Sequence, residues 1–447
     1  MKKIFHLFKS RLFLFFVIIG IQACVIIVLA YRFYDLSPVI NEIFFVSSIV
    51  LVLFIVNKKQ DPSYKIAWMI PILVLPLAGM LLYFFFSQRR SGKRSREKIA
   101  RIYRDTSSCL KDGDGLCKLL QTEGDAGLQI SYIRKTRQYP AFTNTQTKYF
   151  NMGEKFFDRF IEELKQAKRY IFLEFFTIKQ GYMWNTTLEV LRQKAQEGVE
   201  VRLIYDDIGC ISLPEEYPDT LSGYGIKCVV FNRFIPIAKS PFNNRDHRKI
   251  VVIDGSTAFV CGTNLADEYI NREKRFGVWK DACLMMQGDA AFGFLVIFLQ
   301  MWNTITKTQT DIEAYRPSAS KVSGKCFVQP FADSPFDDLP LSENVFLNMI
   351  GRAKRYLYVT TPYLILNTTL RTAFATAAQS GVDIRIMTPH IPDKKIVFLL
   401  TRANYDFLLE NGVKIYEFTP GFLHAKTYAC DDEIGIIGTV NTDYRCV

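Results

Sequence analysis

Two short strings of the sequence carry the same residue types at the same spacing. His247, Lys249 and Asp254 form the pattern H-x-K-x-x-x-x-D, and Asn264 follows seventeen residues after the histidine. The second copy has the same four residue types at the same offsets: His424, Lys426, Asp431 and Asn441. From average residue usage, one such pattern follows a given histidine by chance on the order of once in several thousand cases. Its presence twice in one chain therefore indicates a shared function.

These residue types suit the chemistry of a phosphodiester. On an extended strand, residues two apart project to the same face, so the histidine and the lysine of each string point the same way. Ammonium and amide groups can hold the non-bridging oxygens, while one imidazole attacks phosphorus and the other protonates the leaving oxygen. We therefore expect His247, Lys249, His424 and Lys426 to be catalytic, and Asn264 and Asn441 to bind substrate.

Each string also contains an aspartate, five residues after its lysine. We group Asp254 and Asp431 with the catalytic set, with the expectation that each orients or charge-pairs a neighbour and does not act on the substrate. The lysines already supply positive charge and no carboxylate cluster has metal-ligand spacing, so we expect no metal and no cofactor. The chain has two further histidines, and we interpret His390 as structural and His6 as interfacial.

Longer repeats place each string in a copy of the same unit. The sequence AKRY at 167–170 recurs at 353–356, and AQEGVEVR at 195–202 recurs as AQSGVDIR at 378–385. In the first copy an amphipathic helix is expected at 154–168, with strands at 170–177, 201–206, 227–231, 249–254 and 257–261. Apolar strands that alternate with helices are typical of a layered α/β domain. We expect two tandem α/β lobes related by a pseudo-two-fold axis, with the pocket at their seam.

The N-terminal region has a different composition. Apolar stretches at 12–31, 39–56 and 66–86 approach or exceed the roughly 20 residues that cross a bilayer. We expect two or three N-terminal transmembrane helices and a multi-pass protein of the cell membrane. The basic cluster at 89–104 favours a cytoplasmic catalytic part. The same cluster would also attract an anionic membrane surface.

Nearly all of the net positive charge lies in the same region. Sixteen basic and five acidic residues lie in the first 105 positions, which leaves the remainder nearly neutral within a total of +12. A nearly neutral remainder argues against nucleic acid as a partner. The ten cysteines have no regular spacing and are interpreted as small core residues. The domains expected are a membrane anchor at 1–90, a basic juxtamembrane linker at 91–140, and lobes at 141–320 and 321–447.

With both strings identified, the chain resembles the phospholipase D superfamily and, within it, the bacterial cardiolipin synthases. The resemblance runs from about residue 66 to the end. It rests on NRDHRK at 244–249, GTNLADEY at 262–269 and PGFLHAK at 420–426, together with LEFF at 173–176, YDDIG at 205–209 and TPY at 361–363. It implies phospholipase D-like lobes that transfer a phosphatidyl group from one phosphatidylglycerol to another, giving cardiolipin and glycerol. The partners implied are phosphatidylglycerol and cardiolipin.

The resemblance also implies roles for single residues. His247 would form a phosphohistidine and His424 would act as general acid and then base, although the two roles could be exchanged. Glu174 is either a residue that supports the substrate site or a buried structural carboxylate. Asp206 and Asp207 are interpreted as turn residues after a strand.

Two departures from the family keep other functions open. Members usually continue well past the second asparagine, so we expect the second lobe to be short at its C-terminal end, and Cys261 stands where a glycine is usual. The alternatives are a hydrolytic phospholipase D or phosphodiesterase, and a truncated, inactive membrane protein of the same fold.

Overall fold

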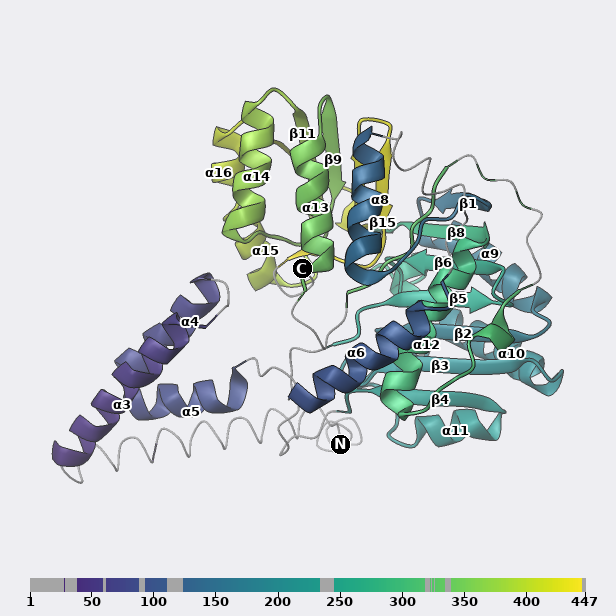
Figure 1. The fold of residues 1–447 in the computed structure, drawn as a ribbon, viewed down its shortest axis with the longest axis horizontal. Helices are drawn as coiled ribbons and strands as arrows, with labels where there is room; N and C mark the ends of the chain where they lie inside the picture. The colour runs from purple at the N-terminus through teal and green to yellow at the C-terminus, as the bar shows by residue number, and fades with distance from the viewer. Residues whose placement is uncertain are drawn as a thin grey trace. The chain divides into compact units, whose positions relative to one another are not determined.

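The computed structural model describes residues 28, 38–58, 62–87, 93–110, 124–233, 245–317, 322, 324, 326–333 and 339–443. The chain forms two compact units (Figure 1). One comprises Met1–Arg90 with Asn232–Asn244, and the other comprises Ser91–Phe231 with Arg245–Val447. Both copies of the repeat belong to the second unit. The four-part domain division stays a prediction.

In the part of the first unit that the structure describes, three helices pack together. These are α3 (Pro38–Val56), α4 (Pro62–Val74) and α5 (Pro76–Phe86). Proline begins each helix, a position where its missing N–H costs nothing. A small core joins them: Val52, Ile55, Ile72 and Tyr83. Many apolar side chains of α3, such as Val50 and Phe54, are exposed.

The expected membrane helices are supported only in part by this unit. The second apolar stretch forms α3, and the third is divided between α4 and α5 at Leu75. The first stretch lies outside the described residues except for Val28. Within the ranges that are described, no helix has both the length and the apolar character needed to cross a membrane.

A seven-stranded mixed sheet forms the centre of the first lobe, in the order β1-β8-β6-β5-β2-β3-β4. Strands β2, β3 and β4 are parallel, and the neighbours from β2 to β1 pair antiparallel. The strands are β1 (Thr145–Phe150), β2 (Tyr170–Phe175), β3 (Glu200–Asp206), β4 (Ile226–Phe231), β5 (Lys249–Ile253), β6 (Thr257–Cys261) and β8 (Cys283–Gly288).

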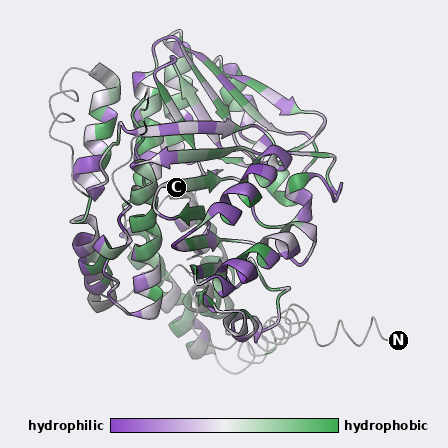
Figure 2. Cartoon of the chain, turned by 90° about the vertical axis from the view of Figure 1, so that its right-hand side faces the viewer, coloured by the Kyte–Doolittle hydropathy of each residue, from purple (hydrophilic) through white to green (hydrophobic). Residues whose placement is uncertain are grey.

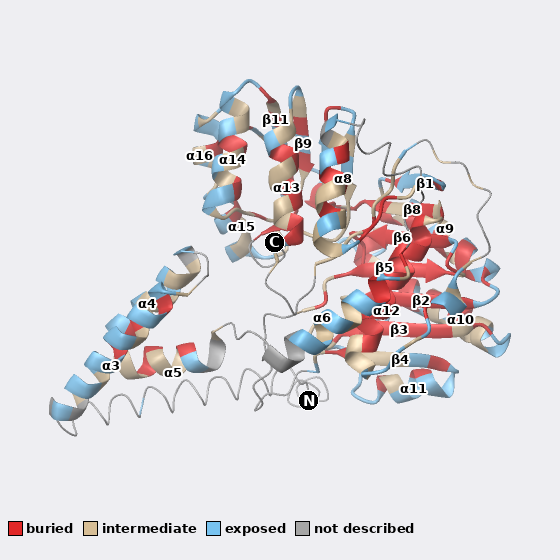
Figure 3. Cartoon of the chain, in the orientation of Figure 1, coloured by how far each residue is buried: buried red, intermediate tan, exposed pale blue. Residues whose placement is uncertain are grey.

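Helices cover both faces of this sheet. One face carries α9 (Gly153–Gln166) and α10 (Tyr182–Gln196), and the other carries α12 (Ala290–Thr306). Helix α12 is apolar on all sides and buried from Ala290 to Asn303, because α6 (Lys93–Ser107) packs against it. Figure 3 shows the central strands as buried along most of their length. Hydrophilic residues are prominent on the peripheral helices in Figure 2.

The second lobe repeats the strand order of the first. Its sheet runs β12-β11-β9-β14-β15, which matches β4-β3-β2-β5-β6 of the first lobe position for position. Its strands are β9 (Tyr356–Thr360), β11 (Asp383–Pro389), β12 (Lys414–Phe418), β14 (Thr427–Cys430) and β15 (Ile434–Ile437). Helices α13 (Leu341–Arg352) and α14 (Thr368–Gln379) pack on its core. The expected tandem α/β repeat is therefore confirmed.

Short elements complete the second unit and join its lobes. Strand β7 (Val278–Lys280) of the first lobe pairs in parallel with β13 (Gly421–Leu423) of the second, and β10 (Leu364–Ile365) pairs with β16 (Thr442–Asp443). The remaining elements are α8 (Gly124–Arg137), α11 (Tyr217–Gly223), α15 (Lys395–Arg402), α16 (Tyr405–Glu410), η1 (Asp267–Ile270) and η2 (Glu313–Tyr315).

Candidate active site

The two H-x-K strings occupy equivalent places in the two lobes. Lys249 begins β5, and Lys426 immediately precedes β14. Both lysines are buried, and each Nζ donates to the main-chain oxygen of the histidine two residues before it, at 2.6 Å from Lys249 to His247. Lys426 makes the same hydrogen bond to His424. In each string the lysine is thereby fixed beside its histidine.

Each histidine is held by the other lobe. His247 Nδ1 lies 3.0 Å from the main-chain oxygen of Thr439, and His424 Nδ1 lies 2.7 Å from Asp281 Oδ2. The main-chain N–H of His424 also donates to the oxygen of Lys280, at 2.7 Å. Both Nδ1 partners are acceptors, so Nδ1 carries the hydrogen in each ring and Nε2 is the nitrogen available for chemistry.

Aromatic rings lie beside both imidazoles. Phe176 lies 5.0 Å from the His247 ring, measured between centroids. His424 lies among three rings, with Tyr269 at 5.4 Å, Trp279 at 5.3 Å and Phe422 at 5.9 Å. The three rings around His424 come from both lobes and belong to one apolar cluster at the seam. The low polarity of this lining strengthens the electrostatic interactions within the site.

Burial and positive charge hold both imidazoles neutral. Burial lowers the pKa of His247 well below its usual value, and Lys249, Lys426 and His424 lower it further. Burial and then Lys426 lower the pKa of His424 to about 4, although Asp281 opposes this shift. Each lysine thus acts on the histidine of the opposite lobe as well as on its own. A bound phosphodiester would add negative charge between the two lobes and raise both pKa values.

Residues 160–284 and 346–447 match the family described as "Cardiolipin synthase, PLD-like domain". The chain belongs to this phospholipase D-like cardiolipin synthase family. Residues 45–88 match a second family, described as "Phospholipase_D-nuclease N-terminal". The two H-x-K strings lie inside the two matched segments of the first family.

Several curated and solved proteins are similar to this chain. An uncharacterized protein of Streptococcus mutans is 39% identical over 88% of this chain and 86% of its own length. A cardiolipin synthase of Alkalihalophilus pseudofirmus is 32% identical over 91% of this chain and 82% of its own length. The crystal structure of phosphatidylserine synthase from Haemophilus influenzae Rd KW20 is 15% identical, with a TM-score of 0.49, over 71% of this chain and 83% of that one.

Asp281 is a site residue that the motif analysis missed. It lies between β7 and β8, is buried, and also accepts hydrogen bonds from Ala282 N (2.8 Å) and Trp279 Nε1 (3.5 Å). Burial alone would raise its pKa, but His424 and then Lys426 outweigh burial and lower it. In the sequence, Asp281 is a single acidic residue in the short connection between two strands. Such residues are too common to identify a catalytic site.

The structure places the two motif aspartates at the other end of their strands. Asp254 accepts hydrogen bonds from the main-chain N–H groups of Lys168, Arg169 and Tyr170, at 2.8, 2.8 and 2.9 Å. At about 3.3 Å per residue, the five residues from Lys249 to Asp254 span about 16 Å of strand. Asp431 binds the corresponding residues of the second lobe: Lys354, Arg355 and Tyr356.

These contacts explain why two separate sequence repeats occur together. The AKRY string of each lobe presents three N–H groups to the aspartate of that lobe's H-x-K-x-x-x-x-D string. The aspartate thereby joins the start of one central strand to the end of its neighbour. This geometry agrees with the expectation that each aspartate orients a neighbour, because both carboxylates accept hydrogen bonds from the main chain at the far end of their strands. Their place in the catalytic set stays a prediction.

Glu174 lies on the opposite face of the sheet from His247. Its neighbours Leu173 and Phe175 pack in the core that carries α9 and α10, whereas Glu174 alternates to the face of α12. There Arg248 Nη1 lies 3.5 Å from Glu174 Oε1. Burial and the nearby Asp246 raise the pKa of Glu174 well above its usual value, although Arg248 opposes the shift. Its placement favours the structural alternative over substrate binding.

The two asparagines support the loops around the site. Asn264 Oδ1 accepts from Thr177 N at 3.0 Å, and its Nδ2 donates to Tyr269 Oη at 2.7 Å. Asn441 Nδ2 lies 3.3 Å from Asp443 Oδ2. Both asparagines are buried. Asn264 holds Tyr269, whose ring lies near His424, and Asn441 lies two residues after Thr439, which contacts His247. A direct contact of either amide with substrate stays a prediction.

Asp206 also positions the first string. It is buried at the end of β3, where its Oδ1 accepts from Ile208 N (2.9 Å) and Gly209 N (3.1 Å). These bonds make it the turn residue that was expected. Its Oδ2 additionally accepts from Asp246 N at 3.2 Å, next to His247. Burial is the main reason that the pKa of Asp206 rises to about 6.

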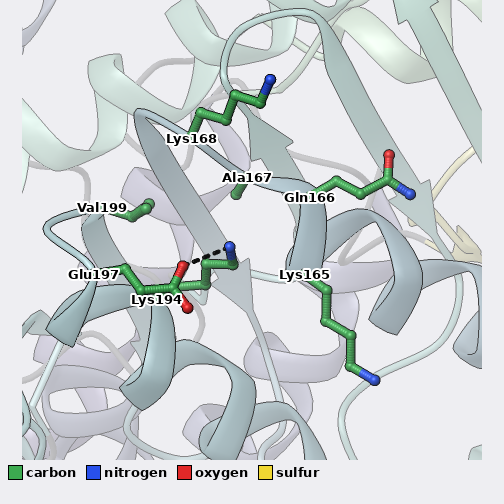
Figure 4. Close-up of a pocket in the computed structure, with 7 residues that line it drawn as sticks. All are labelled: Lys165, Gln166, Ala167, Lys168, Lys194, Glu197 and Val199. Carbon is green, nitrogen blue, oxygen red and sulfur yellow. Dashed lines mark hydrogen bonds and ion pairs between the residues drawn. The ribbon is translucent and has the colours of Figure 1, made fainter.

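A shallow depression elsewhere on the first lobe is separate from these residues. It has a volume of about 590 Å³ and lies at the C-terminal ends of α9 and α10 (Figure 4). Lys168 lines the depression, and its N–H donates to Asp254. The depression therefore lies at the end of the sheet remote from His247. Among the described residues, no group of three or more histidine, cysteine, aspartate or glutamate side chains could hold a metal ion.

Proposed function

We propose that this protein is a phosphatidyltransferase that makes cardiolipin from two molecules of phosphatidylglycerol and releases glycerol. The observation that carries the proposal is the reciprocal attachment of the two histidines, each held through Nδ1 by the opposite lobe. One phosphodiester can then lie between two imidazoles and two buried ammonium groups. The names of the cardiolipin synthase relatives support the choice of lipid.

The first step forms a covalent intermediate. Nε2 of His247 attacks phosphorus, a P–N bond forms, and the P–O bond to glycerol breaks. The negative charge of the bound phosphodiester raises the pKa of His424, so that this ring carries a second proton on Nε2 as well as the one on Nδ1. The Nε2 proton passes to the departing glycerol oxygen, so no free alkoxide is released and His424 becomes neutral. Lys249 and Lys426 balance the charge that accumulates on the non-bridging oxygens.

The second step reverses the first with a different alcohol. His424 now accepts the proton from a hydroxyl of the second phosphatidylglycerol, and the resulting oxygen attacks phosphorus. The P–N bond breaks, which regenerates His247 and releases cardiolipin. Water in place of that hydroxyl would give phosphatidic acid by the same route.

The neighbours of the two histidines support this division of roles. The carboxylate of Asp281 stabilises a positively charged imidazole, so His424 is the better proton donor. Thr439 offers His247 a neutral carbonyl oxygen, which orients the ring and keeps its Nε2 lone pair for attack.

Labelled phosphatidylglycerol tests the proposal. Membranes that contain the full chain should produce labelled cardiolipin and an equal amount of glycerol. His247→Ala and His424→Ala should each abolish both products, whereas His390→Ala should not, because His390 is half-exposed and pairs with Glu417 at the surface. Phosphatidic acid as the main product would identify a hydrolase. No product from the unchanged chain would overturn enzymatic function.

We also propose that residues 1–90 anchor the protein in the cell membrane through two or three hydrophobic segments, with the catalytic part cytoplasmic. The exposed apolar side chains of α3 support this, since water is a poor environment for such a surface. The full chain should remain in the membrane pellet after alkaline extraction. Protease added to the cytoplasmic side should cleave the second unit, and protection of that unit would reverse the orientation.

A further inference from the structure

Helix α15 presents its apolar side chains to the solvent. Ile396 is 76% exposed and Leu399 is 67% exposed, and Leu400 is also exposed. These positions are spaced i, i+3 and i+4, so they form one stripe along the helix. In a surface helix of a soluble domain such a stripe normally faces the core, but here the core-facing side chain is Thr401, which is buried. Figure 3 shows α15 at one end of the second lobe.

Positive charge borders this stripe. Lys394 and Lys395 stand at the start of the helix and Arg402 ends it, and all three are exposed. The helix itself contains no acidic residue. An exposed apolar stripe with basic residues at both ends is the pattern of a helix that lies in the boundary between lipid head groups and acyl chains. A patch that binds another protein chain would have no comparable need for cations at each end.

The start of α15 is linked to His424 through aromatic rings. Tyr363 Oη donates to Asp393 Oδ2 at 2.6 Å, and Lys394 Nζ lies 5.5 Å from the centre of the same ring. The Tyr363 ring is 6.5 Å from that of Phe422, and Phe422 is 5.9 Å from the His424 ring.

A second path leads from the inner face of α15 to the other end of the site. Leu364 N donates to Thr401 Oγ1 at 3.2 Å, and Leu364 begins β10. Strand β10 pairs with β16, which immediately follows Asn441. The helix is therefore attached to the candidate active site at both ends and is not a peripheral feature.

We propose that α15 docks the catalytic unit on an anionic phospholipid bilayer, with Ile396, Leu399 and Leu400 inserted among the lipids and the basic residues on the head groups. This inference rests on the proposed lipid substrate, and it assigns the place at which that lipid is presented. Docking here would bring head-group phosphates to the side of the seam where His424 lies.

Photo-crosslinking tests the contact without turnover. The full chain carrying His247→Ala, with p-benzoylphenylalanine at position 399, is reconstituted in phosphatidylglycerol vesicles and irradiated. The matched control places the same crosslinker at Leu128, which is exposed on α8. We expect several-fold more lipid adduct from position 399. Equal adducts at both positions, or adducts between two copies of the chain at 399, would overturn the proposal.

Kinetics provide the second test. The variant Ile396→Gln with Leu399→Gln should lose about tenfold in rate on phosphatidylglycerol vesicles, because two apolar side chains no longer favour insertion. Its rate on phosphatidylglycerol dispersed in detergent micelles should stay within about twofold of the unchanged chain. Parallel loss on both substrates, or no loss on vesicles, would contradict docking. If position 399 crosslinks lipid but the chain with His247 intact makes no cardiolipin, the proposed function is refuted and the docking surface is not.

Discussion

The imidazoles of His247 and His424 have unlike partners, a main-chain oxygen and a carboxylate. Each Nδ1–H donates to a single acceptor, so the charge of that one acceptor affects the pKa of its histidine. The carboxylate raises the proton affinity of His424 against the opposing effects of burial and Lys426. Asp281 is therefore a positioning residue that tunes the proposed acid.

We predict that Asp281→Asn lowers kcat about a hundredfold, in the range found when the hydrogen-bond partner of a functional histidine is removed. Without the carboxylate the pKa of His424 falls further, so the alkaline limb of the pH–rate profile should move to lower pH. The control is Asp383→Asn, at a surface ion pair with Lys414. An unshifted profile with reduced kcat would indicate a purely structural role for Asp281.

A close approach next to Asp281 gives a second prediction. A Cβ added at Gly262 would lie 2.0 Å from Asp281 Oδ1, so alanine there must displace the carboxylate. Because displacement by about 1 Å can cost about a hundredfold in rate, Gly262→Ala should reduce kcat to a similar extent as Asp281→Asn. Gly351→Ala is the matched control, since nothing lies within 4 Å of its added Cβ. Normal kcat in Gly262→Ala would show that the carboxylate can move without consequence.

At the scale of elements, the motif aspartates hold neighbouring strands together. Asp431 has a φ of 55° and accepts three main-chain hydrogen bonds, and Asp254 does the same with a φ of 52°. The lowered pKa of Asp431 follows from these N–H donors, which outweigh the effect of burial.

We predict that Asp431→Asn lowers the free energy of unfolding by about 2 kcal/mol, through weaker hydrogen bonds to a neutral side chain. Asparagine tolerates the left-handed backbone, so no strain is added. The kcat of the folded enzyme should remain within about threefold. Asp432→Asn, at an exposed position in the same turn, should change the free energy of unfolding less. Loss of kcat without loss of stability in Asp431→Asn would support a catalytic role for this carboxylate.

The sequence predicted the elements around the site well, because their signals are local and repeated. Apolar runs located β2 to β6 within about two residues, and the duplicated H-x-K strings located both histidines. The role of Asp254 could not be predicted in the same way. It depends on which strand begins beside the end of β5, and no single string of the sequence contains that information. Asp281 and Thr439 were missed for the same reason: each meets its histidine only through the packing of one lobe on the other. Glu174 was ambiguous because its face depends on the register of β2.

At the scale of the whole molecule, burial of two neutral histidines makes stability depend on pH. His424 titrates near pH 4 when folded but near 6.5 when unfolded, so between these values the unfolded chain binds more protons. The folded state therefore loses stability as the pH falls below about 6.5.

We predict that the free energy of unfolding in detergent decreases by about 2 kcal/mol from His424 alone between pH 7.5 and pH 5. The thermal midpoint should fall accordingly, and the lowered pKa of His247 should add to the effect in the same direction. His424→Gln should show a shallower dependence on pH across this interval. An equal slope in both proteins would mean that His424 is not the titrating group.

The unequal partners of the two histidines show what a single chain with two lobes can acquire by substitution. In an assembly of two identical single-lobed chains, every substitution appears on both sides of the axis, and the two imidazoles stay equivalent. Here one chain contains both lobes, so a carboxylate can stand beside one ring while a peptide oxygen stands beside the other. Joining the copies covalently allows the nucleophile and the proton carrier to be fixed as different residues, whereas two equivalent imidazoles could exchange these roles from one turnover to the next.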